Sequence, residues 1–91
     1  MWEIIYTKQA LKDKEKLTAA KLDKKAKGLI DIMKENPFQI PPLYEKLTGN
    51  LAGIYSRRIN LQHRLIYEVL DEPHGQYKGY IKIARMWTHY D

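Results

Sequence analysis

Four β-prone runs follow one another through the second half of the chain, and the turns between them are short. They occupy residues 43–47, 54–59, 64–70 and 77–87. Gly49 and Gly53 mark the first turn, residues 60–63 form the second, and Pro73 with Gly75 marks the third. Connections this short return the chain to an antiparallel neighbour, because a parallel neighbour needs a crossover of about a dozen residues or more. The second half is therefore predicted to fold as a mostly antiparallel four-strand meander.

The first half of the chain is typical of one strand followed by two helices. Residues 2–7 are aromatic and β-branched, and Thr7 is placed to cap a helix that begins at Lys8. Thr18 is expected to cap a second helix, which should end before Pro37. Its apolar residues share one face and are Leu22, Ala26, Leu29, Ile30 and Met33. We therefore predict an α+β fold in which a two-helix hairpin covers one face of the sheet and leaves the other face partly open.

Length and charge limit what the chain can be. With 91 residues it is expected to form one domain, spanning 1–91. Its net charge of +5 indicates an anionic partner, which could be nucleic acid, an acidic protein or an anionic membrane surface. Residues 1–9 contain no basic leader, and no segment approaches the roughly 20 apolar residues that span a bilayer. We therefore expect a cytoplasmic protein that does not enter a membrane.

The chain lacks the residues that several classes of chemistry require. The chain has no cysteine, which excludes disulfides, thiolate catalysis and cysteine-bound zinc. Its three histidines show neither an HxxxH nor an HxH spacing, so no metal and no other cofactor is expected. Phosphate loops of the form GxxxxGK[S/T] and nucleophile elbows of the form GxSxG are also absent. The lysine-rich helices can be interpreted as a solvated face or as an arm that binds RNA.

The stretch from residue 45 to residue 67 combines cations with apolar strand residues. Glu45 stands at its edge, and no other acidic residue lies within it. This composition is typical of a phosphate site. The candidate phosphate-binding residues are Lys46, Arg57, Arg58 and Arg64.

Strand geometry limits which arginines can act together. Arg57 and Arg58 are neighbours, so their side chains point to opposite faces of the sheet. Arg58 shares a face with Arg64 only if the loop holds an odd number of residues, such as 60–62, or if a bulge intervenes. We predict the register that brings Arg58 and Arg64 together on the open face. The alternatives are a surface or salt-bridge role for Arg57 on the helical side, and pairing of the other two with Glu68 or other acids.

Glu45 and His89 are candidates for proton transfer. Cleavage of RNA by its own 2′-hydroxyl needs a base for that proton, an acid for the leaving 5′-oxygen, and cations for the phosphoryl oxygens. A carboxylate, a histidine and two guanidinium groups would supply these without a metal. Alternatively, Glu45 is an exposed acid and His89 a disordered end. Tyr90 is a candidate to stack on a base or hold a phosphate, whereas His63 and His74 are expected to be structural or solvated.

Two segments resemble a known family. The chain reads EKLTGNLAGIYSRRINLQHRLIYEV from residue 45 and ARMWTHY from residue 84. The combination of NLxGxxSRRI, HRLxY and a final HY is similar to that of the YoeB/Txe toxins of bacterial toxin–antitoxin pairs, within the RelE superfamily. The resemblance covers nearly the whole chain, more loosely over the helices, and implies a RelE-like fold.

The same resemblance implies an activity and its residues. It implies an mRNA interferase, an endonuclease that cuts mRNA in the A site of the 70S ribosome. It also implies a YefM-like antitoxin as partner and a homodimer. By this resemblance Glu45 is the general base, His89 is the general acid, and Arg64 stabilises the pentavalent phosphate. Arg58 is then a second phosphate-binding arginine, and Tyr90 helps to position the substrate.

Two functions of other classes stay open. The first is a RelE-scaffold protein that acts by binding, like the ParE toxins that poison gyrase, although such proteins lack the set of one glutamate, two arginines and one histidine found here. The second is a basic domain that binds RNA or the ribosome without chemistry. Mapping of mRNA ends in cells that produce the protein would separate these alternatives.

Overall fold

The order of elements along the chain is one strand, two helices and four strands. The computed structural model describes residues 1–47 and 53–87. Within them the elements are β1 (Glu3–Tyr6), α1 (Lys8–Ala19), α2 (Asp23–Glu35), β2 (Tyr44–Lys46), β3 (Ile54–Arg58), β4 (Arg64–Leu70) and β5 (Tyr80–Arg85). None of the helices in these ranges is long and apolar enough to cross a membrane. The predicted order is confirmed.

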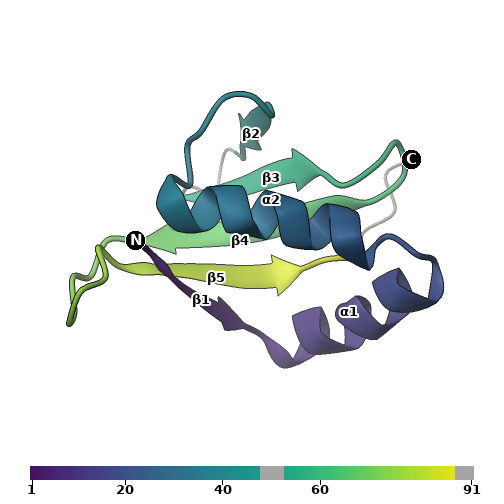
Figure 1. The fold of residues 1–91 in the computed structure, drawn as a ribbon, viewed down its shortest axis with the longest axis horizontal. Helices are drawn as coiled ribbons and strands as arrows, with labels where there is room; N and C mark the ends of the chain where they lie inside the picture. The colour runs from purple at the N-terminus through teal and green to yellow at the C-terminus, as the bar shows by residue number, and fades with distance from the viewer. Residues whose placement is uncertain (48–52, 88–91) are drawn as a thin grey trace.

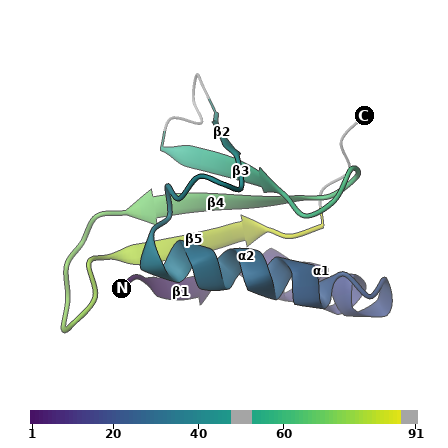
Figure 2. The ribbon, with the colours of Figure 1, turned by 45° about the horizontal axis from the view of Figure 1, so that its top comes forward.

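The described strands form one sheet in the order β1-β5-β4-β3-β2 (Figure 1). The pairs β2–β3, β3–β4 and β4–β5 are antiparallel, as expected for a meander. β1 returns to lie parallel to β5, which the long connection through both helices permits. The mostly antiparallel sheet was therefore predicted correctly. Both helices lie on one side of it (Figure 2).

The hydrophobic core lies between the helices and the sheet. α2 turns the side chains of Ala26, Ile30 and Met33 inward, which confirms the predicted apolar face. The sheet supplies alternate residues of β4 and β5, as the period of two requires. These buried strand residues are Leu65, Tyr67, Ile81 and Ile83. Residues between them on the same strands therefore point to the opposite face.

The start of α1 agrees with the prediction, whereas the boundary between α1 and α2 differs from it. The Thr7 hydroxyl accepts a hydrogen bond from the Ala10 amide at 3.0 Å, so its predicted capping role is confirmed. The prediction that Thr18 caps the second helix is wrong. α1 continues through Thr18, whose hydroxyl donates to the Lys14 carbonyl one turn earlier. The chain reverses three residues later, where Lys21 adopts a left-handed φ of 61°.

Two connections also differ from their predictions. The segment 37–42 was expected to run extended, but it turns and bends before β2, which is only three residues long. The last strand was expected to begin at residue 77, but β5 begins at Tyr80. Tyr77 instead exchanges two backbone hydrogen bonds with His74 and so belongs to the turn.

Candidate active site

The β3–β4 hairpin pairs Arg58 directly with Arg64. Five residues separate them, and the first of these, Ile59, donates its amide to the carbonyl of the last, His63, at 2.9 Å. This odd-numbered connection keeps the alternation of side chains in step across the hairpin. The predicted register, with both arginines on one face, is confirmed.

The edge strand β2 adds a carboxylate to the same face. Glu45 lies opposite Ser56, and Ser56 lies two residues before Arg58 on β3. Cross-strand partners and residues two apart share a face, so Glu45, Ser56, Arg58 and Arg64 all point away from the helices. Residues from three different strands thus meet on the open face of the sheet.

Arg64 is the centre of this group, which we call the arginine cluster (Glu45, Ser56, Arg58 and Arg64). Its Nη1 lies 3.1 Å from a Glu45 carboxylate oxygen and 3.3 Å from the Ser56 hydroxyl. The Arg64 side chain is only 5% exposed, whereas that of Glu45 is 57% exposed. Arg64 is therefore held in place by partners that are already present, while Glu45 keeps an oxygen accessible to a ligand.

A cavity opens over the arginine cluster. Its volume is about 480 Å³, within the usual range for small-molecule sites. Besides the arginine cluster, the end of the proline-rich segment and the start of β2 line it. These additional lining residues are Pro42, Leu43 and Tyr44. A carboxylate, a hydroxyl and two guanidinium groups at one cavity can bind a phosphate and accept a proton.

Arg57 lies on the other face, inside the protein. It is 1% exposed, and its guanidinium donates to the carbonyls of Pro37, Gln39 and Pro42 at 2.9, 3.0 and 2.6 Å. Its Nε also donates to the Tyr67 hydroxyl at 3.2 Å. The expectation that Arg57 binds phosphate therefore does not fit its position. The alternative, a surface or salt-bridge role on the helical side, named the correct face of the sheet. The partners of Arg57 are nevertheless backbone carbonyls rather than an acid.

Lys46 does not join the arginine cluster either. It pairs with Tyr55, and the register of β2 places it on the face that carries Arg57. It is exposed at the edge of the sheet. The alternation of neighbouring side chains separates Lys46 from Glu45, and the predicted contact of Lys46 with phosphate stays a prediction.

His89 and Tyr90 lie outside the described residues, and the described part of the chain ends at Trp87. The Trp87 ring stacks on the ring of His63, with centroids 3.8 Å apart and an angle of 22° between planes. His63 is buried and directly precedes Arg64. The expected structural role of His63 is therefore confirmed, and Trp87 packs on this residue two positions before His89 in the chain.

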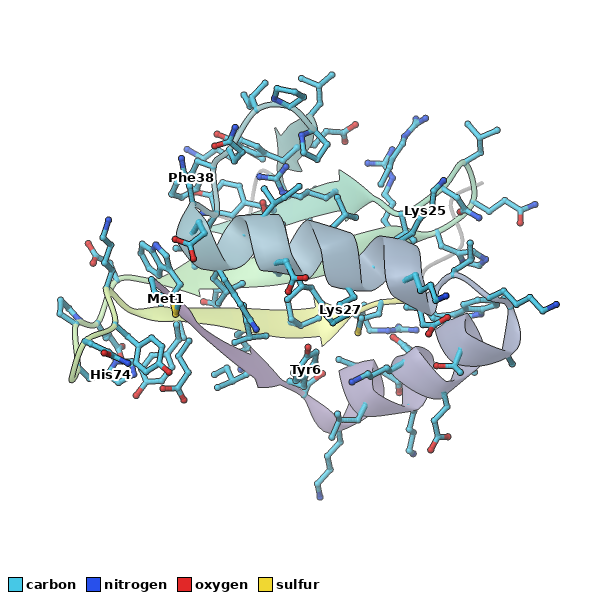
Figure 3. The ribbon with its side chains drawn as sticks, in the orientation of Figure 1. Met1, Tyr6, Lys25, Lys27, Phe38 and His74 are labelled. Atoms are coloured by element: carbon cyan, nitrogen blue, oxygen red, sulfur yellow. The ribbon has the colours of Figure 1, made fainter. Side chains whose placement is uncertain are left out.

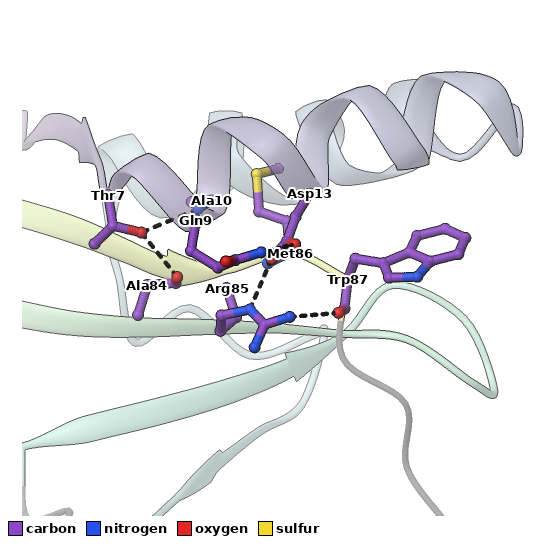
Figure 4. Close-up of polar contacts among 8 residues, drawn as sticks. All are labelled: Thr7, Gln9, Ala10, Asp13, Ala84, Arg85, Met86 and Trp87. Carbon is purple, nitrogen blue, oxygen red and sulfur yellow. Dashed lines mark hydrogen bonds and ion pairs between the residues drawn. The ribbon is translucent and has the colours of Figure 1, made fainter.

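The end of β5 is tied to α1 through a buried acid. Asp13 is fully buried, and one of its carboxylate oxygens accepts from Arg85 Nε at 2.8 Å and from the Met86 amide at 3.0 Å (Figure 4). Gln9 donates to its other oxygen at 2.9 Å. Burial raises the pKa of Asp13, but these three hydrogen bonds outweigh it and hold the pKa below its ordinary value. Asp13 is therefore a carboxylate at neutral pH.

His74 lies in the β4–β5 turn (Figure 3), beyond the end of β4, whereas Arg64 is the first residue of that strand. Its Nδ1 is 2.9 Å from the Glu72 carbonyl, and its Nε2 is 3.0 Å from a Glu3 carboxylate oxygen. Both partners only accept, so only the doubly protonated ring can donate to both. The Glu72 carbonyl and then Glu3 raise the pKa of His74 above its ordinary value. The expected solvated histidine is thus a partly exposed contact between the turn and β1.

The lysines of α2 are exposed. Lys25 and Lys27 project from the exposed side of α2 (Figure 3), and Lys27 forms an exposed pair with Asp31 at 3.1 Å. Within residues 1–47 and 53–87, no three His, Asp or Glu side chains come close enough to hold a metal ion. The arginine cluster is therefore the candidate active site.

Comparison with known proteins agrees with this geometry. Residues 6–90 match the sequence profile of YoeB-like toxins of bacterial type II toxin–antitoxin systems. The chain belongs to this family. It is 40% identical to the toxin YoeB of Escherichia coli K12 over 55 residues, which make up 60% of this chain and 66% of that toxin.

Solved structures of YoeB proteins resemble the whole chain. The YoeB dimer from Staphylococcus aureus superposes with a TM-score of 0.79 at 35% identity and covers 98% of each chain. The YoeB–YefM complex from the same organism gives a TM-score of 0.77 at 35% identity, with 99% of each chain covered. The predicted RelE-like α+β fold and the resemblance to YoeB toxins are confirmed.

In this YoeB-like chain, Ser56 at the site and the ion pair of Asp13 and Arg85 were not predicted. Ser56 contacts Arg64, but a serine in a strand carries no distinctive signal. The pairing of Asp13 with Arg85 was only weakly indicated, by the position of Asp13 in the sequence. Asp13 lies three residues after Ala10 and four before Leu17, on the buried stripe of α1, where a charged residue requires a partner.

Proposed function

We propose that this protein is the toxin of a type II toxin–antitoxin pair and acts as a ribosome-dependent mRNA endonuclease. The observation that carries the proposal is the ion pair between Glu45 and Arg64, with Arg58 on the same face of the sheet. A proton acceptor and two phosphate-binding cations then share one cavity. Membership of the YoeB-like family supports the same function.

The proposed reaction is an internal transfer at the phosphate. Glu45 takes the proton of the ribose 2′-hydroxyl, and the 2′-oxygen then forms a bond to phosphorus. The bond from phosphorus to the 5′-oxygen breaks, and His89 supplies a proton to that oxygen. Arg64 and Arg58 stabilise the negative charge that builds up on the phosphoryl oxygens. The products are a 2′,3′-cyclic phosphate and a 5′-hydroxyl, and in this proposal no metal is needed.

A role for the ribosome follows from the openness of the site. Glu45 lies on the three-residue edge strand β2, and its side chain is more than half exposed. An RNA bound there would contact the protein on one side only. In the proposal the A site of the ribosome, in the bacterial cytoplasm, holds the codon from the other side and aligns the 2′-hydroxyl with phosphorus. Tyr90 would help to position the same nucleotide.

The proposed protein partners are a YefM-like antitoxin and a second copy of the chain. The support comes from the two S. aureus structures, one of a YoeB–YefM complex and one of a YoeB dimer. The net charge of +5 suits an acidic antitoxin segment laid on the basic surface. Such a segment would compete with RNA for Arg58 and Arg64.

One experiment tests the activity. The chain is induced in bacteria and mRNA 5′ ends are mapped by primer extension, for the wild type and for the variants Glu45→Gln, Arg64→Ala and His89→Gln. We expect cleavage within codons near the start of translated messages, and loss of that cleavage in each variant. His74→Gln is the matched control, because it makes the same substitution at a histidine away from the cavity, and it should cleave like the wild type.

The alternatives give different outcomes. Growth arrest with broken DNA and intact mRNA would indicate a gyrase poison in place of a nuclease. Arrest with neither lesion would indicate a protein that only binds RNA or the ribosome. Cleavage at the wild-type rate by the His89→Gln variant would remove His89 from the role of acid, while leaving the nuclease assignment in place.

A further inference from the structure

The segment 37–42 carries the chain from the end of α2 to the edge strand β2 (Figure 1). It contains neither helix nor strand, so its carbonyl groups need hydrogen-bond donors from elsewhere. Arg57 supplies them at the beginning, the middle and the end of the segment, through the carbonyls of Pro37, Gln39 and Pro42. Its Nε also donates to the hydroxyl of Tyr67, which in turn donates to the Pro37 carbonyl at 3.1 Å. One buried guanidinium therefore sets the course of the segment.

Arg57 also holds the first residue of β2. Tyr44 is its cross-strand partner, and the guanidinium lies over the Tyr44 ring at 5.1 Å from the ring centroid. The rings of Phe38 and Tyr55 pack against the same ring, each with its centroid 5.8 Å away. Tyr44 is thus fixed on the face of the sheet that carries Arg57.

This hold extends to Glu45 through the backbone of β2. Glu45 directly follows Tyr44, so its side chain points to the opposite face of the same strand. A shift or tilt of β2 at Tyr44 must therefore move the Glu45 carboxylate as well. Within the described sheet β2 is an edge strand and pairs with β3 alone. Arg57 gives it the support that a second neighbouring strand would otherwise provide.

The contact on the open face is too weak to fix Glu45 by itself. Its ion-pair partner among the described residues is Arg64, at 3.1 Å, and the exposure of the carboxylate weakens that pair. In the proposed reaction a phosphoryl oxygen also competes for the Arg64 guanidinium. The position of Glu45 beside a bound RNA then depends on what holds β2 from the other face.

We infer that Arg57 is a positioning residue for the general base: by holding the segment 37–42 and Tyr44 from the helical side, it places Glu45 where its carboxylate can take the proton of the 2′-hydroxyl. The inference rests on the proposed nuclease function with Glu45 as the base. Arg57 is 1% exposed and acts only through Glu45. A displacement of the reacting groups by about 1 Å is enough to slow a reaction about 100-fold.

The first test separates the rate of the reaction from the amount of folded protein. Single-turnover cleavage of mRNA on programmed ribosomes is measured at increasing concentrations of the protein. Arg57→Lys should lower the rate at saturation about 10- to 100-fold and change the half-saturating concentration of folded protein by about twofold or less. If Arg57 only contributed to folding, the rate at saturation would stay at the wild-type value and only the total protein needed to reach it would increase.

The second test asks whether the effect of Arg57 requires Glu45. Arg57→Lys is combined with Glu45→Gln, and the residual cleavage of the double variant is compared with that of Glu45→Gln alone. Because the base is already lost, its displacement should cost nothing further, and the two residual rates should agree within about twofold. A general distortion of the cavity would instead slow cleavage by the same factor with and without Glu45.

Gly79→Ala is the control for lost stability. A Cβ at Gly79 would meet the Leu70 carbonyl and the Trp2 ring, which belong neither to the segment 37–42 nor to β2. This variant should unfold at a lower urea concentration, as Arg57→Lys does, but cleave at the wild-type rate at saturation. Tyr67→Phe is the second test variant if Arg57→Lys does not fold, because it removes only the hydroxyl between Arg57 and the Pro37 carbonyl. It should slow cleavage about three- to tenfold, again only when Glu45 is present.

The outcomes distinguish failure of the inference from failure of the proposed function. Equal slowing with and without Glu45, or an unchanged rate at saturation, overturns the role of Arg57. Cleavage by Glu45→Gln at the wild-type rate overturns it too, because the base would be another group, while the nuclease function would stand. If the wild type cuts no mRNA on the ribosome, the proposed function fails and the inference fails with it. Slowing by Arg57→Lys that disappears in the Glu45→Gln background supports the inference.

Discussion

Arg58 and Arg64 face each other across β3 and β4, but only Arg64 is buried. Glu45 and Ser56 fix the buried guanidinium before any substrate arrives. Arg58 stands at the exposed end of the same cavity. In the proposed reaction the two arginines would therefore have different tasks: Arg64 would stabilise the transition state, and Arg58 would meet the incoming phosphate.

The first prediction concerns this difference in preorganisation. Arg64→Lys keeps the charge but loses the planar fork, which contacts Glu45 and in the proposed reaction would also bind a phosphoryl oxygen. We expect the single-turnover rate on ribosomes to fall about 100- to 1,000-fold, as for loss of one fixed transition-state donor. Arg58→Lys should mainly weaken binding and lower the rate at saturation by about tenfold or less. Lys82→Ala, an exposed cation on β5, is the control. Equal effects of the two arginine variants on the rate at saturation would contradict the assignment.

The second prediction concerns the neighbours Arg57 and Arg58. Arg57 satisfies three backbone carbonyls and a tyrosine hydroxyl in the interior, and a lysine cannot reach all four. Arg57→Lys should lower the free energy of unfolding by about 2–4 kcal/mol in urea titrations. Arg58→Lys, one residue away and exposed, should change it by about 0.5 kcal/mol or less. A stability loss confined to the Arg58 variant would show that the face assignment is wrong.

The third prediction concerns the pH dependence of stability through His74. Hydrogen bonds to the Glu72 carbonyl and to Glu3 raise the pKa of His74 in the folded protein. The stabilisation is therefore fully present below the unfolded pKa of about 6.5 and is lost as pH rises through the folded pKa. The melting temperature of the wild type should fall from pH 6 to pH 8 relative to that of His74→Gln. Added salt should reduce the difference, because the pair is partly exposed. An equal change of melting temperature with pH in both proteins would count against this contact.

The fourth prediction concerns the close approach at Gly79. A Cβ built there would overlap the Leu70 carbonyl oxygen and lie 2.7 Å from the Trp2 ring. Gly79 also accepts the Glu3 amide through its carbonyl, so the backbone cannot easily move away. Gly79→Ala should cost about 2 kcal/mol or more of stability, measured by urea unfolding. Gly28→Ala is the control, because a Cβ there meets open space within helix α2 and should be neutral or stabilising.

Alternation along strands made the face of the arginine cluster predictable. Sequence alone left the loop either odd-numbered or four residues long; once an odd-numbered loop is predicted, a period of two places Arg58 and Arg64 on the same face. The same rule separates Lys46 from Glu45 once the register of β2 is known. Sequence does not give that register, because β2 is joined to β3 through a turn whose length does not determine the pairing.

Contacts between segments far apart in the chain were not predictable. Arg57 reaches carbonyls 15 to 20 residues earlier in the chain, and Asp13 reaches Met86 across 73 positions. Propensity and periodicity describe local conformation and cannot choose such partners. Thr18 shows a further limit, since threonine serves equally as a cap or as a helical residue bonded to the preceding turn.

The bonds from Arg57 to the proline-rich segment limit how that segment can change in length. Surface connections usually tolerate insertions and deletions, because little depends on their course. Here the carbonyls of Pro37, Gln39 and Pro42 are all acceptors of one buried guanidinium, and Glu45 follows three residues after the last of them. An added or deleted residue would leave an acceptor unpaired and turn Glu45 to the opposite face of the sheet. Residues 37–42 should therefore tolerate insertions and deletions as poorly as the core does.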